Sequence, residues 1–176
     1  MKYLIFLAAI AIGFYVLVVG HGSRGDRDAK PSDSEVSTEE YAVYSALLRE
    51  GQRVLNETSV SFLSDFDGGG AELLKQAPVL KKSTIADYIQ KNAKTCPLSD
   101  KFTTKVTLVG TDKYGSGREN AVVFFSRVGF DADGGQALVH IGSHCSPACA
   151  DDYYSVLTKA GKEWRVANSI HLRIWN

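Results

Sequence analysis

The chain has 176 residues, of which 44% are hydrophobic and 23% charged, and its 20 basic side chains equal its 20 acidic ones in number. This length suits a single domain, and the share of apolar and aromatic residues excludes an intrinsically disordered chain. A net charge of zero lacks the basic excess that nucleic-acid-binding proteins carry. We therefore expect no nucleic-acid partner.

The strongest feature of the sequence is an uncharged apolar segment from Tyr3 to Val19. As a helix it would span about 25 Å, slightly less than the ~30 Å hydrocarbon core of a bilayer. It is also longer than the ~7–15 apolar residues of a typical cleaved signal peptide. We expect residues 1–20 to be a signal anchor or a signal peptide, with residues 3–19 contacting the membrane. A buried core helix is the alternative, but a segment that is apolar on every face at the N-terminus fits it poorly.

The charges around this segment bear on its orientation. Lys2 favours a cytoplasmic N-terminus, whereas Arg24, Arg27 and Lys30 on the other side oppose it. Because N-terminal apolar segments of this length commonly direct export, we expect an inner-membrane protein with a periplasmic or other extracytoplasmic domain. If the signal is cleaved, the protein is instead secreted to the periplasm.

Residues 21–35 are rich in Gly, Ser and Asp and hold no large apolar side chain, which predicts a flexible linker before a single domain at 36–176. That domain opens with a capping box, in which Ser37 caps the helix and Glu40 reaches back. The apolar residues that follow have helical spacing up to Gly51. Further helices are expected over residues 71–76 and from Ser83 or Thr84 onward.

From residue 102 the apolar period changes to two, which is typical of strands. The predicted strands are Phe102–Val109, Ala121–Val128, Gln136–Gly142, Tyr153–Lys159 and Trp164–Ile174. Short connections with turn residues separate them and favour antiparallel pairing. The expected fold is α+β, with N-terminal helices packed on a curved antiparallel meander of four to five strands.

The helix-first order and the final Lys162-Glu163-Trp164-Arg165-Val166 segment resemble the NTF2-like and cystatin-like folds. The C-terminal third also resembles a group of uncharacterised bacterial exported proteins. That likeness is carried by Phe125–Phe130, Gln136–Ile141, the pair Cys145 and Cys149, Tyr153-Tyr154 and Gly161–Trp164. The resemblance implies a location in the bacterial envelope and no particular activity.

The segment His140–Asp152 concentrates polar and reactive residues and is expected to be a loop between two strands. In an oxidising compartment we expect a disulfide between Cys145 and Cys149, with pairings to Cys96 left open. A zinc site using His140, His144 and both cysteines is a second interpretation. A third is a thiolate nucleophile with His140, His144 or His171 as base and Asp151 or Asp152 orienting it. The disulfide is the favoured interpretation, and with it we expect no metal site and no catalytic residue.

Five residues are candidates for binding: Arg127, His140, His144, Tyr153 and Tyr154. Arg127 is the single charge in an otherwise apolar strand, which is typical either of a snorkelling arginine or of one that meets an anionic ligand. The two tyrosines border the reactive segment, where exposed rings could mark a binding face. No cofactor-binding motif is evident, and we expect no cofactor.

These observations favour a membrane-tethered or exported binding module of the bacterial envelope, with a protein partner and without catalysis. One alternative is a small extracytoplasmic hydrolase or thiol-dependent enzyme that uses residues 140–152. A second alternative is an envelope immunity-type protein that caps a toxin.

Overall fold

The structure, a computed structural model, describes residues 35–60, 69–113, 121–146 and 149–172. All of them belong to one compact unit, residues 31–176. Among these residues no helix has the length and apolar character needed to cross a bilayer. The apolar segment at residues 3–19 lies outside the described residues.

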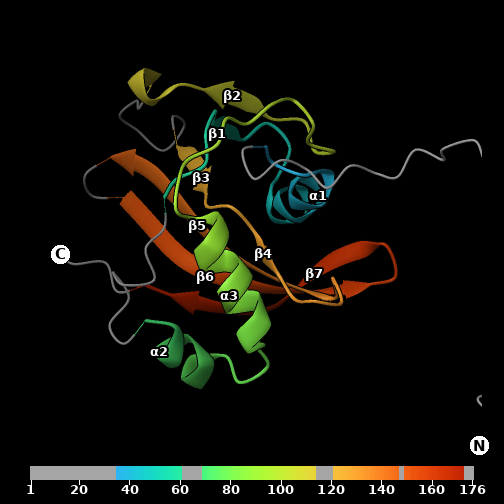
Figure 1. The fold of residues 1–176 in the computed structure, drawn as a ribbon. Helices are drawn as coiled ribbons and strands as arrows, with labels where there is room; N and C mark the ends of the chain where they lie inside the picture. Colours follow the sequence, from blue (N-terminus) through green and yellow to red (C-terminus); the bar gives the residue numbers. More distant parts are fainter. Residues whose placement is uncertain (1–34, 61–68, 114–120, 147–148, 173–176) are drawn as a thin grey trace, which may run out of the picture. The chain divides into compact units, whose positions relative to one another are not determined.

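The described residues form an α+β fold with three α-helices and a seven-stranded sheet (Figure 1). The helices are α1 Thr38–Leu47, α2 Gly69–Gln76, α3 Lys82–Lys91 and a short 3₁₀-helix, Thr111–Lys113. The strands are β1 Arg53–Leu55, β2 Thr107–Val109, β3 Val122–Phe125, β4 Gly129–Phe130, β5 Gln136–Ser146, β6 Cys149–Ala160 and β7 Glu163–His171.

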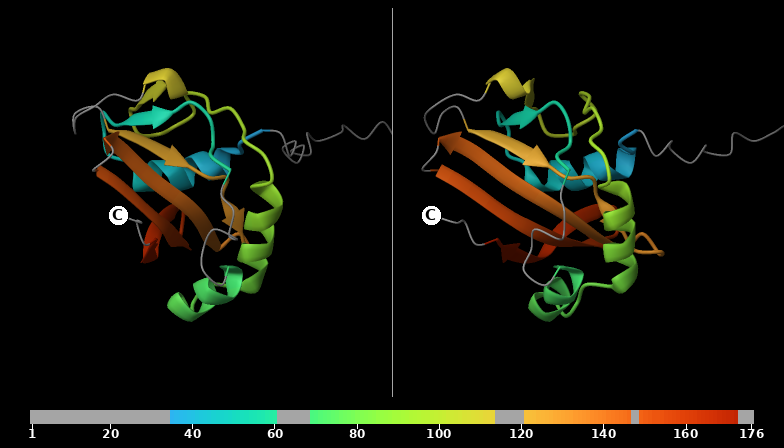
Figure 2. Two further views of the ribbon diagram at one scale, coloured as in Figure 1. Left: turned by 90° about the vertical axis from the view of Figure 1, so that its left-hand side faces the viewer. Right: turned by 60° about the vertical axis from the view of Figure 1, so that its left-hand side comes forward.

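The sheet is mixed rather than a purely antiparallel meander, so the finer topological prediction is wrong. Its order is β2-β1-β3-β5-β6-β7, with β4 added beside β5. Strand β1 runs parallel to both β2 and β3, whereas β3, β5, β6 and β7 pair antiparallel. Parallel pairing needs long crossovers, and the chain provides one because α2 and α3 lie between β1 and β2. Figure 2 shows the long β5 and β6 strands at the centre of this arrangement.

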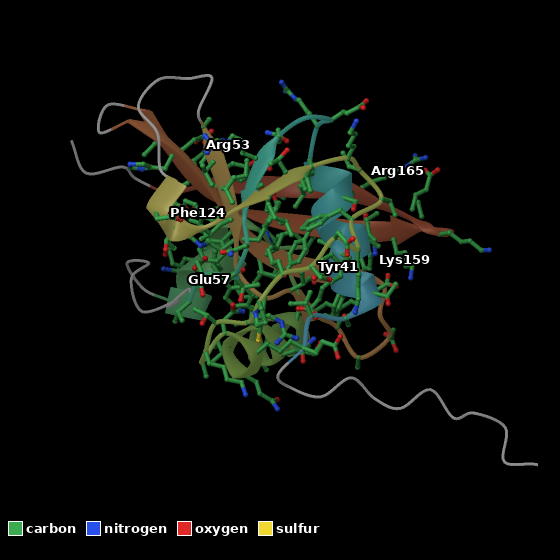
Figure 3. All side chains as sticks on the ribbon, turned by 90° about the horizontal axis from the view of Figure 1, so that it is seen from above. Tyr41, Arg53, Glu57, Phe124, Lys159 and Arg165 are labelled. Carbon is green, nitrogen blue, oxygen red and sulfur yellow. The ribbon has the colours of Figure 1, made fainter. Side chains whose placement is uncertain are left out.

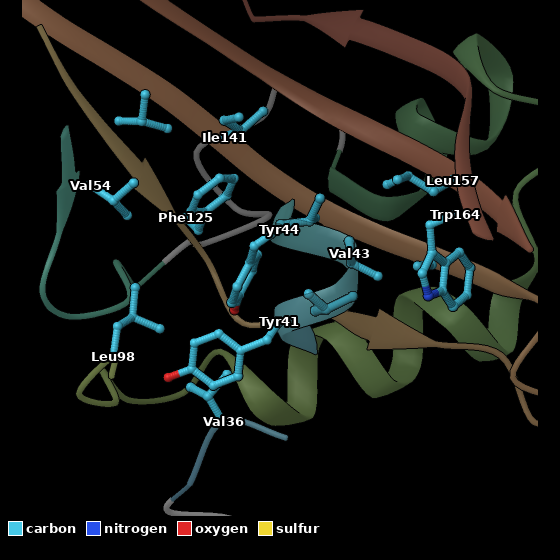
Figure 4. Packing of buried hydrophobic residues seen from close by; sticks show 14 of the residues in the cluster. Val36, Tyr41, Val43, Tyr44, Val54, Leu98, Phe125, Ile141, Leu157 and Trp164 are labelled. Atoms are coloured by element: carbon cyan, nitrogen blue, oxygen red, sulfur yellow. The ribbon is translucent and has the colours of Figure 1, made fainter. Parts of the chain in front are cut away.

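The two faces of the sheet pack against different helices. In β5, Ala137, Val139 and Ile141 join a cluster with α1, whereas Leu138 joins a second cluster with α2 and α3. This is the alternation expected of a strand that is covered on both sides. Figure 4 shows the first cluster, in which the side chains of α1 pack beneath the strands.

Helix α1 begins as its capping box predicts. The Ser37 hydroxyl accepts from the amide of Glu40 at 3.2 Å, and the Glu40 carboxylate accepts from the amide of Ser37 at 2.8 Å. Tyr44 then stacks on Phe125 with ring centroids 4.6 Å apart and donates its hydroxyl to the Ser126 carbonyl at 2.9 Å. These contacts hold the end of α1 against the sheet, beside the pocket described below.

Helix α3 differs from its prediction at the start. It begins at Lys82 after Lys81, which makes no side-chain cap. Thr84 donates to Gln136 instead, and Asp87 accepts from the amide of Phe130 at 2.7 Å. The side chains of Thr84 and Asp87 therefore bind the sheet, because these long-range partners outcompete a local cap.

The segment expected to be a loop is a β-hairpin, so that prediction is also wrong. Strands β5 and β6 stay paired from Gln136 and Thr158 to Ser146 and Cys149, with one register shift near His144. Beyond the predicted ends the pairing continues through small and polar residues, with Ser143 opposite Asp151 and His144 opposite Ala150. The next hairpin turns at Gly161, whose φ of +65° suits the first central position of a type II′ turn.

Candidate functional site

The β5–β6 hairpin separates the candidate binding residues onto opposite faces. Tyr153 lies on the face covered by α1, whereas His140 and Tyr154 lie on the face covered by α2 and α3. His144 is exposed near the end of the hairpin, and Arg127 is buried in the loop after β3. The structure therefore brings together His140 and Tyr154, with ring centroids 5.0 Å apart, and keeps the other three apart from them.

A pocket of about 200 Å³ opens beside Tyr153, where α1 ends. Alternate residues of β5 and β6 face it because side chains on a strand point to one face at every second position. Its apolar lining is Leu47, Val123, Ile141 and Gly142. Its polar lining is Arg49, Gln52, Ser143, Asp151 and Tyr153.

The phenol of Tyr153 stays protonated in this pocket. Burial raises the pKa of Tyr153, the Asp151 carboxylate raises it further, and Arg49 acts in the opposite sense. His171 packs against the Tyr153 ring, with centroids 5.5 Å apart, and its Nδ1 lies 3.8 Å from the Asp151 carboxylate. Tyr153 thus offers a half-buried ring and a hydroxyl donor to a molecule in the pocket.

A separate group of side chains, called here the His140 group, contains His140, Asp152, Phe124 and Tyr154. Nε2 of His140 is hydrogen-bonded to the Asp152 carboxylate, and its ring lies between Tyr154 and Phe124, whose centroid is 6.0 Å away. The other ring nitrogen, Nδ1, is fully buried and has no hydrogen-bond partner among the described residues. A carboxylate that orients a histidine is typical of acid–base sites. Here, however, the nitrogen left for a substrate is closed off.

The hydrogen bond between His140 and Asp152 is expected to stabilise the fold. Asp152→Ala removes the partner of Nε2 and leaves both nitrogens of a buried imidazole unsatisfied, at a cost of about 1–3 kcal/mol. The neighbouring Asp151 is 60% exposed, so Asp151→Ala is the matched control and is expected to change stability by less than about 0.5 kcal/mol. Urea unfolding of both variants measures the difference, and equal losses would contradict the pairing of His140 with Asp152.

Arg127 meets a carboxylate of its own chain. Its guanidinium binds both oxygens of Glu40, at 2.7 and 2.9 Å, and also donates to the Glu35 carbonyl and to the sulfur of Cys96. Arg127 and Glu40 are 3% and 1% exposed. Asn92 holds the Arg127 backbone through its amide side chain. An anionic ligand would have to displace Glu40, so the geometry gives Arg127 a structural role.

The cysteine and metal interpretations meet the structure only in part. The side chains of Cys145 and Cys149 lie outside the described residues, and so do the expected disulfide and the thiolate interpretation that depend on them. Cys96 is buried and forms no disulfide with another residue that the structure describes. Within the described ranges no three His, Cys, Asp or Glu side chains converge on a point that could hold a metal.

Most of the pocket carries no local signal in the sequence. Arg49 and Gln52 follow α1 as ordinary polar residues of a turn, and Ser143 is a small residue in a strand. Their convergence depends on strand register and on where α1 ends. Of the pocket residues, Tyr153 is a predicted binding residue because it borders the reactive segment, and Asp151 enters the thiolate interpretation.

No family model, curated protein or solved structure matches the chain.

Proposed function

We propose that the protein is an interaction module of the bacterial envelope, attached to or exported across the cytoplasmic membrane by its N-terminal segment. The pocket beside Tyr153 is its docking site for one side chain of a protein partner. The observation that carries this proposal is the pocket itself, which is lined by both apolar and polar side chains.

The size of the pocket supports a side chain as occupant. Sites for cofactors and drug-sized molecules usually enclose ~300–1,000 Å³. About 200 Å³ is smaller and suits a single anchor residue, and such anchors supply much of the binding energy of protein interfaces. A half-buried tyrosine is also among the residue types enriched at these positions.

The geometry of the His140 group supports binding rather than catalysis. A histidine that acts as base must reach the proton it removes, directly or through one water. Nδ1 of His140 is enclosed by its surroundings and Nε2 is occupied by Asp152. The enzyme alternative with His140 as base would need this face of the sheet to open.

Photo-crosslinking in living cells tests the proposal. Benzoylphenylalanine at Glu50, which is exposed and adjacent to Arg49, is expected to capture one protein, identified by mass spectrometry. The same probe at Gln76, at the exposed end of α2, is the control and should not capture that protein. Equal capture from both positions, or none from Glu50, would contradict a docking site at the pocket.

Tyr153→Ala in the Glu50 probe strain is expected to lower the yield of the crosslinked partner about tenfold or more, because an anchor at the centre of an interface is lost. Val166→Ala removes an exposed apolar side chain elsewhere on the sheet and serves as the control. A yield unchanged by Tyr153→Ala, with the protein still folded, would remove Tyr153 from the interface.

A further inference from the structure

We propose that the pocket beside Tyr153 is a carboxylate receptor, and that its occupant is an acidic side chain of the protein partner. The inference rests on the proposed function and specifies the chemistry of its docking site. Four different side chains can donate hydrogen bonds into the pocket: Arg49, Gln52, Ser143 and Tyr153.

Arg49 supplies the positive charge for such a guest. The residue is exposed, and within the described part of the chain its guanidinium forms no salt bridge with a carboxylate of the protein. Arg49 and Tyr153 line the same pocket. Guanidinium groups bind carboxylates with two parallel hydrogen bonds, the strongest arrangement available to side chains.

Gln52 and Tyr153 each offer a hydrogen-bond donor to the pocket. The carbonyl oxygen of the Gln52 side chain accepts from the amide of Arg49 at 2.6 Å, which leaves its NH₂ group as the free end. Because the pKa of Tyr153 is raised by burial and by Asp151, its hydroxyl keeps its proton and remains a donor. Both groups therefore favour an acceptor in the pocket.

Asp151 is the one carboxylate in the lining, and it opposes an anion. Its side chain is 60% exposed, so water screens its charge as it screens that of the exposed Arg49, and His171 lies 3.8 Å from it. Leu47, Val123 and Ile141 suit a short apolar stem behind the carboxylate. A glutamate side chain combines these two parts.

Glutarate is the probe, because it carries a carboxylate on a short methylene stem; glutaramide is its uncharged control. The full-length protein in mild detergent, with labelled Ile, Leu and Val methyl groups, reports binding through the NMR signals of Ile141 and Val123. We expect millimolar glutarate to shift both signals and glutaramide to leave them in place. Equal shifts from the two compounds, or none from glutarate, would overturn the carboxylate assignment.

Arg49→Gln tests the residue that carries the charge. We expect it to weaken glutarate binding and partner crosslinking about tenfold, as the loss of a charge-assisted hydrogen bond implies. Arg165→Gln is the control, because Arg165 is also exposed, pairs with Thr158 and does not line the pocket. Figure 3 shows Arg165 near Lys159. Both variants should melt at the temperature of the parent, since neither side chain is buried.

The two experiments separate failure of this inference from failure of the proposed function. A partner captured at Glu50 but insensitive to Arg49→Gln would overturn the carboxylate assignment and leave the docking site in place. Glutarate binding without any captured protein would overturn the docking function and assign the pocket to a free small carboxylate.

Discussion

Arg127→Met is expected to lower the free energy of unfolding by about 3–5 kcal/mol, because it leaves the buried carboxylate of Glu40 without its countercharge. Glu40 is 1% exposed and would keep only the backbone amides of Ser37 and Val128 as donors. The same change frees the Glu35 carbonyl and removes a contact of Cys96. Urea unfolding monitored by circular dichroism measures the loss.

Adding Glu40→Gln to Arg127→Met provides the control. The amides of Ser37 and Val128 donate to different oxygens of Glu40, so glutamine keeps an acceptor for one of them and removes the buried charge. Because an unpaired buried charge costs more than one lost hydrogen bond, the double variant is expected to be more stable than Arg127→Met alone. A double variant as unstable as the sum of the two single changes would show that the residues do not interact.

The same ion pair makes stability depend on acid. Burial alone raises the pKa of Glu40, but the hydrogen bonds from Arg127, Ser37 and Val128 and the charge of Arg127 outweigh it, so the pKa lies below its ordinary value of 4.5. The unfolded chain therefore binds this proton more readily. The stabilisation is complete above about pH 4.5 and is lost as the pH falls through the lower pKa of the folded protein. Glu40→Gln should reduce this acid sensitivity.

Gly129→Ala is the second large effect and acts through close packing of β4 against α3. An added methyl group would lie 2.5 Å from Cβ of Tyr88 and 2.6 Å from both its Cα and the carbonyl oxygen of Thr84. Backbone atoms cannot rotate away, so α3 would have to move. Overpacking of this kind costs about 1–3 kcal/mol, and a rigid helix places the change at the upper end.

Gly135→Ala is the matched control for Gly129→Ala. Its added methyl group would meet nothing within 4 Å, and it lies in the turn before β5. We expect it to leave the melting temperature within a few degrees of the parent. If the two alanine variants melted together, the close approach of β4 to α3 would be contradicted.

Local signals in the sequence predicted local structure well. The capping box of Ser37 and Glu40 needs only residues three positions apart, and it is present as expected. The turn at Gly161 also depends on its immediate neighbours. The central position of β3, between β1 and β5, follows from a strand that is apolar on both faces.

Features that depend on distant pairing could not be predicted in this way. Glu40 is 87 residues from Arg127 in sequence, and the residues around each of them do not indicate that the two form an ion pair. The parallel position of β1 requires a register that three residues cannot specify. Tyr154, expected near the surface, is 2% exposed because its side chain packs against α3, with its ring centroid 5.8 Å from that of Tyr88.

The pocket depends both on local patterns in the sequence and on contacts between distant segments. Tyr153 and Asp151 share a face because of strand alternation, which sequence reasoning can anticipate. Arg49 and Gln52 join them only because α1 ends at Leu47 and packs on that face. The position of Arg49 in space, and not its place in the sequence, makes it a candidate binding residue.

Labelling of a surface cysteine in intact cells tests the location on which the proposed partner depends. Lys162→Cys places a thiol in the exposed turn between β6 and β7, far along the strands from the pocket. A maleimide that cannot cross membranes should modify this variant, above the background of the parent, as completely in cells with a permeable outer layer as in lysed cells. Modification only after the cytoplasmic membrane is broken would place the pocket inside the cell and contradict the proposed envelope function.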